Sequence, residues 1–219
     1  MRILYVKAVI FDMDGVVTDT MPYHFRAWKK VYAEQGMPLS KKDVYLREGQ
    51  PGSRMIREVF QERGRFYDEK LAKEMLLRKE QIFNRIVRPA FVPGARTLLR
   101  VLHSRNIRTA LVTGTARQEV HRILPAGLLK KFDVVVTGDE VKHGKPNPEP
   151  FLKALKKLRL RPSETVVIEN APFGILSARK AHITCIALPS YLSRSYLKDA
   201  DFVFSSYRDL RKNLDFALF

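Results

Sequence analysis

Short apolar runs recur along the chain, and most of them do not alternate with polar residues. A parallel strand that is covered on both faces has this continuous pattern, rich in valine and isoleucine. We therefore predict strands at Val6–Phe11, Thr109–Thr113, Val134–Thr137, Val166–Ile168, Ile183–Leu188 and Phe202–Phe204. Apolar residues at helical spacing predict helices between them, at Ala95–Arg105, Arg117–Leu124 (with Thr115 as its N-terminal cap), Glu149–Leu158 and Phe173–Ala181. This alternation indicates an α/β fold with a doubly wound, Rossmann-like, mostly parallel sheet and helices on both of its faces.

One long region interrupts the alternation. Residues 16–91 contain no convincing strand, and their apolar positions recur at helical spacing. The predicted helices are Tyr23–Gln35, a short helix with a capping box of Ser40 and Asp43, a helix capped by Ser53, and Asp68–Ile86. We interpret residues 16–91 as an all-helical cap inserted after the first strand. Residues 1–15 and 92–219 then form the α/β core.

The composition favours a globular protein of a reducing compartment, and we expect it in the cytoplasm. Hydrophobic residues make up 45% and charged residues 29% of the 219 positions, which excludes disordered and fibrous chains. Cys185 is the single cysteine, so no disulfide can form within the chain. No uncharged apolar run reaches the roughly 20 residues that span a bilayer. Lys7 interrupts the apolar N-terminal segment, which we interpret as a strand rather than a targeting signal.

The net charge of +17 indicates an anionic partner. A phosphorylated small molecule and a nucleic acid both fit this sign. The basic residues are dispersed in doublets on predicted helices, and no nucleic-acid motif accompanies them, so we expect the small molecule and not the nucleic acid. We expect a monomer or weak dimer with no membrane partner.

Two acids follow the first predicted strand, in the order Asp12-Met13-Asp14-Gly15. Ligands of doubly wound sheets bind at the carboxyl ends of the strands, where this pair lies. Close carboxylates repel each other, and a hard cation such as Mg²⁺ relieves the repulsion. A polar turn that merely ends the strand has the same composition. A calcium loop does not fit, because its glycine belongs at position 6 and a glutamate at position 12, where this chain has Tyr23.

Polar residues also follow the other predicted strands. Thr113 and Gly114 end the second strand before a helix, where a hydroxyl and free backbone N–H groups can bind an anion. Lys145 is fixed between a glycine and a proline, and it suits a phosphate as a point charge. Glu169 and Asn170 follow a later strand. This set fits phosphoryl transfer. A phospho-receiver domain also uses Asp, Thr and Lys, but it has no large insert after its first strand.

The sequence resembles the haloacid dehalogenase-like hydrolase superfamily, and in particular the branch that contains β-phosphoglucomutase and related sugar-phosphate phosphatases. The motifs that carry the resemblance are Asp12-Met13-Asp14-Gly15, Thr113, Lys145-Pro146 and Glu169-Asn170, together with the helical insert and its segment Thr18–Trp28. The resemblance implies a Mg²⁺-dependent phosphatase acting on a small phosphorylated metabolite. A β-phosphoglucomutase-like phosphotransferase is the alternative.

The resemblance also implies the roles of individual residues. Asp12 would form an aspartyl-phosphate, and Asp14 would act as general acid and base. Thr113, Gly114 and Lys145 would bind the phosphoryl group. The metal ligands would be Asp12, Asp14, and Glu169 or Asn170.

Two positions depart from the family pattern, and the role of a third residue, His24, is open between two interpretations. Many members have an aspartate where this chain has Asn170, which removes a negative charge from the metal site. The mutases carry a cap arginine as a second phosphate clamp, and the aligned residue here is Gly52, with Arg54 two residues on. Its absence favours hydrolysis. His24 either assists Asp14 across the cap boundary or is a helix histidine satisfied by its neighbours.

Overall fold

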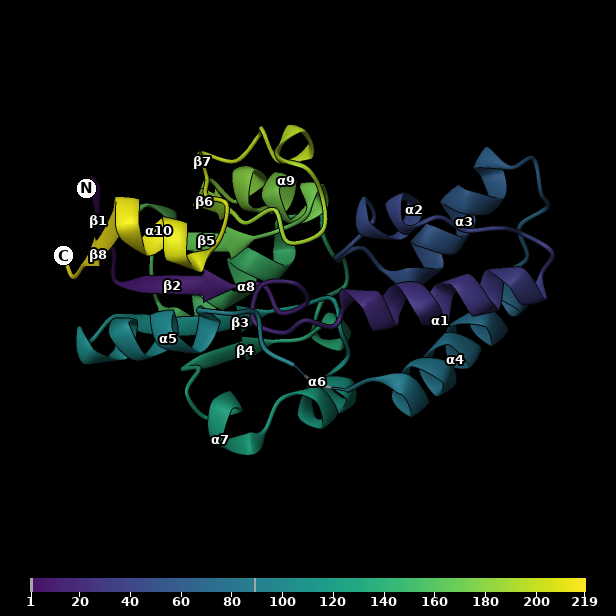
Figure 1. Cartoon of the computed structure of the whole chain (residues 1–219), viewed down its shortest axis with the longest axis horizontal. Helices are drawn as coiled ribbons and strands as arrows, with labels where there is room; N and C mark the ends of the chain where they lie inside the picture. Colours follow the sequence, from purple (N-terminus) through teal and green to yellow (C-terminus); the bar gives the residue numbers. More distant parts are fainter. Residues whose placement is uncertain (1, 89) are drawn as a thin grey trace.

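A six-stranded sheet, parallel throughout, forms the centre of the larger part of the molecule (Figure 1). The structure is a computed structural model that describes residues 2–88 and 90–219, so residue 1 of the predicted core and residue 89 of the predicted cap lie outside it. The strands lie in the order β4–β3–β2–β5–β6–β7. Their bounds are β2 (Ala8–Phe11), β3 (Arg108–Val112), β4 (Val134–Val136), β5 (Thr165–Glu169), β6 (Thr184–Ala187) and β7 (Phe202–Val203). All six predicted strands exist, with ends displaced by one or two residues.

Helices cover both faces of this sheet, which confirms the doubly wound architecture. Side chains alternate along β2, so that Val9 and Phe11 join one apolar cluster while Ala8 and Ile10 join another. The first cluster includes α5 (Ala95–Ser104), α6 (Arg117–Ile123) and α10 (Tyr207–Asn213), and the second includes α8 (Glu149–Leu158) and α9 (Pro172–Lys180). The remaining short helices of this part are α7 (Ala126–Leu129) and the 3₁₀ turns Gly138–Glu140, Pro162–Glu164 and Arg194–Tyr196.

The N-terminal segment forms two strands where the sequence pattern predicts one. β1 (Arg2–Tyr5) pairs in parallel with β8 (Leu214–Ala217), and this two-stranded sheet is separate from the main one. The chain turns at Lys7, whose ammonium lies 2.7 Å from Glu164 Oε1. Ile3 and Tyr5 of β1 are exposed, so this strand lacks the buried pattern that identifies the others. No helix among the described residues is long and apolar enough to cross a membrane.

The four predicted cap helices lie together at one end of the molecule (Figure 1). They are α1 (Met21–Glu34), α2 (Lys41–Tyr45), α3 (Gly52–Glu62) and α4 (Glu69–Ile86). Ser40 and Asp43 form the predicted capping box, in which the Asp43 N–H lies 3.2 Å from Ser40 Oγ. The predicted cap at Ser53 is wrong, because α3 already begins at Gly52. Pro51 occupies the N-cap position, where its fixed φ starts the turn without a side-chain hydrogen bond.

Two neighbouring segments connect these helices to the sheet. The Asp19 N–H donates to the Ala90 carbonyl at 2.8 Å, and the Val92 N–H donates to the Val17 carbonyl at 3.1 Å. The chain passes between the sheet and the cap helices along these two segments, directly after β2. The predicted domain boundaries at residues 15 and 92 lie close by and stay a prediction. The two segments place the helices beside the carboxyl end of β2, where the acid pair follows.

Candidate active site

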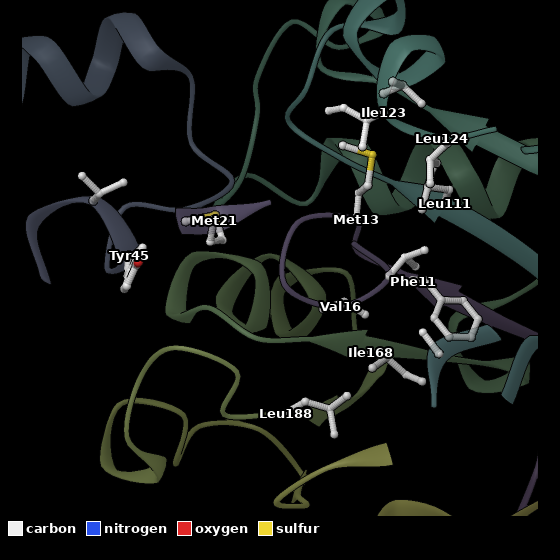
Figure 2. Packing of buried hydrophobic residues seen from close by; sticks show 14 of the residues in the cluster. Phe11, Met13, Val16, Met21, Tyr45, Leu111, Ile123, Leu124, Ile168 and Leu188 are labelled. Atoms are coloured by element: carbon white, nitrogen blue, oxygen red, sulfur yellow. The ribbon is translucent and has the colours of Figure 1, made fainter. Parts of the chain in front are cut away.

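The turn after β2 presents Asp12 and Asp14 on the same side of the chain. The Asp12 N–H continues the ladder by donating to the Ile168 carbonyl at 3.0 Å. Met13 between the two acids is fully buried, and Figure 2 shows its side chain among the apolar residues near Ile123. Gly15 then takes a positive φ of 87°, a conformation that favours glycine. The apolar anchor between the acids therefore directs both carboxylates away from the core.

Lys145 forms the centre of a buried charge cluster. Its Nζ lies 2.5 Å from Asp12 Oδ1 and 2.6 Å from Glu169 Oε1, and all three side chains are almost completely buried. Burial lowers the pKa of Lys145, but the two carboxylates outweigh this effect and raise it, so the lysine stays charged. Burial and the neighbouring Glu169 and Asp14 raise the pKa of Asp12 to about 8, against the opposing effect of Lys145. The ionised form of Asp12 is thus disfavoured here unless further positive charge compensates it.

Asp14 is held by hydroxyl groups from both parts of the molecule. Its Oδ2 accepts from Thr115 Oγ1 at 3.0 Å and from Thr113 Oγ1 at 3.3 Å, while Oδ1 accepts from Thr20. The predicted role of Thr115 as the cap of α6 is wrong, since Ala116 occupies that position and the Thr115 hydroxyl serves Asp14 instead. Burial raises the pKa of Asp14, but His24 and the hydroxyls of Thr20 and Thr115 outweigh this effect and lower it to about 2.

His24 of α1 contacts Asp14 across the boundary between cap and core. Its Nε2 lies 3.2 Å from Asp14 Oδ1, and its ring stacks on Phe83 with the centroids 4.1 Å apart. Burial and the nearby Lys79 ammonium lower the pKa of the imidazole. The side chain is thus satisfied by its neighbours, and one of those neighbours is Asp14; that His24 assists Asp14 stays a prediction.

Asn170 and Asp12 offer oxygen atoms that suit a divalent cation. Asp12 Oδ2 and Asn170 Oδ1 are buried without a hydrogen-bond partner among the described residues. Unpaired buried oxygens are costly, and a hard cation would satisfy them. Both oxygens of Glu169 are engaged, one by Lys145 and the other by the Asn170 N–H at 3.0 Å. The geometry therefore fits Asn170 better than Glu169 as a direct metal ligand.

The fit of this site to a divalent cation does not depend on a cluster of acidic side chains alone. Within residues 2–88 and 90–219, no three His, Cys, Asp or Glu side chains are arranged to hold a metal ion. The candidate donors are the Asp12 carboxylate, the Asn170 amide and the carbonyl of Asp14, which accepts from Asn170 Nδ2 at 3.1 Å. A substitution at Gly15 would fill this place, because a Cβ there would lie 2.2 Å from Asn170 Nδ2.

A cavity of about 190 Å³ joins this cluster to the cap helices. Asp12, Asp14 and Thr113 line its floor, and Trp28 and Met55 of the cap line it as well. Lys79 of α4 also lines it, buried to all but 8% of its surface, with its ammonium over the rings of Phe83 and Trp28. No ion pair of Lys79 exists among the described residues. It therefore places a positive charge at the cap side of the cavity.

The structure brings together most of the residues singled out from the sequence, from four strand ends and the first cap helix. The set that meets around the cavity floor is Asp12, Asp14, His24, Thr113, Gly114, Lys145, Glu169 and Asn170. Arg54 does not belong to it. Its guanidinium pairs with Glu58 at 2.8 Å and lies over the Phe173 ring, outside the cavity lining.

Sequence reasoning missed three residues that contact or line the site: Thr20, Glu48 and Lys79. Lys79 had a signal, because it falls four residues after Met75 and four before Phe83, inside the apolar stripe of its helix. Thr20 and Glu48 lie in connecting segments without periodicity. Only the packing of the cap onto the sheet brings them to Asp14 and Asn170.

Comparisons with known proteins agree with this geometry. The family described as haloacid dehalogenase-like hydrolase matches residues 6–182. A phosphorylated carbohydrates phosphatase of Thermotoga maritima is 35% identical over 81% of this chain and 82% of its own length. The β-phosphoglucomutase of Bacillus subtilis is 27% identical over 84% of this chain and 83% of its own length. A solved structure of a hydrolase from Pseudomonas syringae superposes with a TM-score of 0.87 at 27% identity, covering 94% of this chain and 97% of the other.

Proposed function

The chain belongs to the haloacid dehalogenase-like hydrolases and is a phosphatase of that family, and from this premise we propose that it hydrolyses a small phosphorylated metabolite, such as a sugar phosphate, through an aspartyl-phosphate on Asp12. The observation that carries the proposal is the asymmetry of the Asp12 carboxylate. Lys145 holds Oδ1 at 2.5 Å, whereas the buried Oδ2 has no partner among the described residues. An oriented carboxylate with one free oxygen is suited to attack phosphorus.

The first half of the reaction uses Asp12 as nucleophile and Asp14 as acid. Oδ2 of Asp12 forms a bond to phosphorus while the bond from phosphorus to the ester oxygen breaks. A proton on Asp14 passes to the leaving oxygen, which departs as an alcohol. The lowered pKa of Asp14 favours its ionised form at neutral pH in the absence of substrate. The negative charge of a bound phosphate beside it raises its pKa, which favours the protonated form when substrate binds.

The second half uses Asp14 as base. Water attacks the phosphorus of the aspartyl-phosphate, Asp14 accepts the proton of that water, and the acyl-phosphate bond breaks to release Asp12 and inorganic phosphate. Thr113 and the backbone N–H of Gly114 would bind the phosphoryl oxygens through both halves. Lys145 offsets their charge while it remains paired with Asp12 and Glu169.

Magnesium is the cofactor that this donor set would hold. Asp12, the carbonyl of Asp14 and Asn170 would be its ligands, because two of them present unpaired buried oxygens. When bound, the ion would neutralise the negative charge that the phosphate and the carboxylates bring together.

Packing around Gly52 supports hydrolysis over the mutase alternative. A Cβ at this position would lie 2.5 Å from Leu76 Cδ2 and 3.2 Å from Trp28 Cζ2, so no larger side chain fits there as the cap is packed. Arg54 is paired with Glu58 outside the cavity. A second phosphate clamp of the mutase kind is therefore missing from both candidate positions.

A hydrolysis screen over phosphorylated metabolites tests the proposal. The enzyme is incubated with sugar phosphates and other small phosphomonoesters, with and without Mg²⁺, and released phosphate is measured. We expect phosphate from a subset of the compounds, only with Mg²⁺, and none from a parallel preparation of Asp12→Asn. Absence of release from every compound in the presence of Mg²⁺, or equal release by Asp12→Asn, would contradict the proposal.

A further inference from the structure

We propose that Glu48, in the segment between α2 and α3, is a metal ligand supplied by the cap, and that it replaces the negative charge that Asn170 does not provide from the core. The inference rests on the proposed Mg²⁺-dependent function and deepens it. Its consequence is that binding of the cation holds the cap against the sheet.

The first observation is the contact between Glu48 and Asn170. Both carboxylate oxygens of Glu48 lie near Asn170 Nδ2, at 3.2 Å and 3.1 Å. The same nitrogen lies 3.1 Å from the carbonyl oxygen of Asp14. Oxygens from the cap and from the turn after β2 thus converge where Nδ2 of Asn170, at the end of β5, now donates. Oxygen donors from several segments are the environment that Mg²⁺ selects.

The second observation is the unpaired oxygen on the same amide. Asn170 Oδ1 is buried and has no hydrogen-bond partner among the described residues. A half-turn of the amide exchanges Oδ1 with Nδ2 without moving the rest of the side chain. Oδ1 would then face the oxygens of Glu48 and Asp14, an arrangement that is repulsive without a cation and favourable with one. This unpaired atom separates the site from an ordinary acidic cluster.

The third observation is the charge balance. The ammonium group of Lys145 pairs with Asp12 and Glu169, while Glu48 lines the same cavity as Asp12 without a share in that pairing. Glu48 has no ion pair among the described residues, and its carboxylate accepts hydrogen bonds there from the neutral amide of Asn170. A carboxylate enclosed beside other carboxylates is destabilised unless a cation compensates it.

Close packing holds the Glu48 segment on the site. Gly49 has a φ of 82°, and a Cβ there would lie 2.8 Å from Lys145 Cδ. A Cβ on Gly114 would lie 3.1 Å from the carbonyl oxygen of Gly49. The cap segment therefore touches the core directly at Gly49, the residue after Glu48. Because the ligand comes from the cap, a cation that binds both parts favours the closed arrangement, and closure favours the cation by the same free energy.

Mg²⁺ titrations of metal-free protein, followed by isothermal calorimetry without substrate, test the ligand assignment. We expect Glu48→Gln to weaken Mg²⁺ binding by about tenfold or more, and Asn170→Asp to tighten it in the wild-type background. The double variant Glu48→Gln/Asn170→Asp should recover most of the lost affinity, because the charge returns from the core side. Glu74→Gln, which removes the same charge from an exposed position of α4, is the matched control and should bind as wild type does.

Hydrogen exchange of the backbone amides in residues 47–52 tests the coupling to cap closure. Mg²⁺ should slow exchange of this segment in wild type, and it should not do so in the double variant, although that variant binds the ion. Equal Mg²⁺ affinity of wild type and Glu48→Gln would overturn the proposal and leave the phosphatase function intact. A wild type that binds no Mg²⁺ would overturn both. If Mg²⁺ slowed exchange in residues 47–52 equally in wild type and in the double variant, Glu48 would be only a hydrogen-bond partner of Asn170 and not a metal ligand.

Discussion

Lys145 Nζ lies 2.5 Å from Asp12 Oδ1, and the two residues are 133 positions apart in the sequence. The lysine also bonds to Glu169 at 2.6 Å and to the Val112 carbonyl at 3.3 Å, so its ammonium is fixed by three elements of the sheet. The pairing selects one oxygen of Asp12 and leaves the other free. The following predictions depend on this arrangement and on the contacts around it.

Asp12→Asn should abolish turnover while the protein stays folded. An amide cannot form the acyl-phosphate, yet it has nearly the same shape as the carboxylate. We expect kcat to fall by about a thousandfold or more, which corresponds to roughly 4 kcal/mol in the barrier. Thermal unfolding followed by circular dichroism should show that the variant retains its cooperative transition. Activity within about tenfold of wild type would exclude the covalent mechanism.

Removal of divalent cations should stop the reaction. Asp12, Asp14 and Glu169 cannot receive a phosphate dianion while their charge is only partly compensated by Lys145. Dialysis against a chelator should reduce phosphate release to background, and added Mg²⁺ should restore it. If the dialysed enzyme kept its rate of phosphate release, Lys145 and the hydroxyl groups would suffice to bind the phosphate without a metal ion.

β-Glucose 1-phosphate, if accepted, should be released as glucose and inorganic phosphate. Retaining and reorienting a bisphosphate needs a second phosphate clamp, and neither Gly52 nor Arg54 supplies one. Both products are followed in one reaction, with a bisphosphate activator present. If isomerisation to glucose 6-phosphate were faster than phosphate release, the protein would be a mutase and the hydrolase assignment would be wrong. In a companion variant, Gly52→Arg, we expect loss of stability, because the side chain would collide with Leu76.

His24→Leu should lower activity more than stability. The variant removes the contact between Nε2 and Asp14 Oδ1 but keeps apolar packing on Phe83. Proton transfer by a positioned group contributes roughly 100-fold or more, and a partner of that group should account for part of it, so we expect kcat to fall by about tenfold. His24→Gln, which can still donate to Asp14, is the control and should lose less. Parallel losses of activity and of the unfolding midpoint in both variants would assign His24 to packing alone.

Glu140 should make stability depend on pH in the acidic range. Burial raises its pKa, but hydrogen bonds from Lys157 and the Thr137 N–H lower it, to about 2. Its folded pKa is below its unfolded value, so its stabilisation is full above the unfolded pKa and is lost as the pH falls toward 2. The difference in urea midpoint between wild type and Glu140→Gln should therefore stay constant from pH 6 down to about pH 5, and shrink from there to pH 3 as the pH passes the unfolded pKa of 4.5. A difference that stays constant down to pH 3 would contradict the assignment.

The sequence by itself determined the sheet and the floor of the site. Buried parallel strands are identifiable because both faces need apolar residues, and their polar ends fall on one edge of the sheet whatever the helices do. For this reason Asp12, Thr113, Lys145 and Asn170 could be expected together before their distances were known. The first strand pair, β1 with β8, escaped prediction because an exposed two-stranded sheet has no buried run.

Only the tertiary structure decided which cap residues reach the site. Glu48 contacts Asn170 across 122 positions, and Thr115 serves Asp14 across 101, where local reasoning had assigned it to a helix end. Such contacts depend on how irregular segments pack against the sheet, and these segments carry no periodic signal. Arg54 shows the converse, since sequence spacing placed it near the clamp position and its pairing with Glu58 takes it away. Strand ends are thus readable from local pattern, whereas the partners that the cap brings to them are fixed by packing alone.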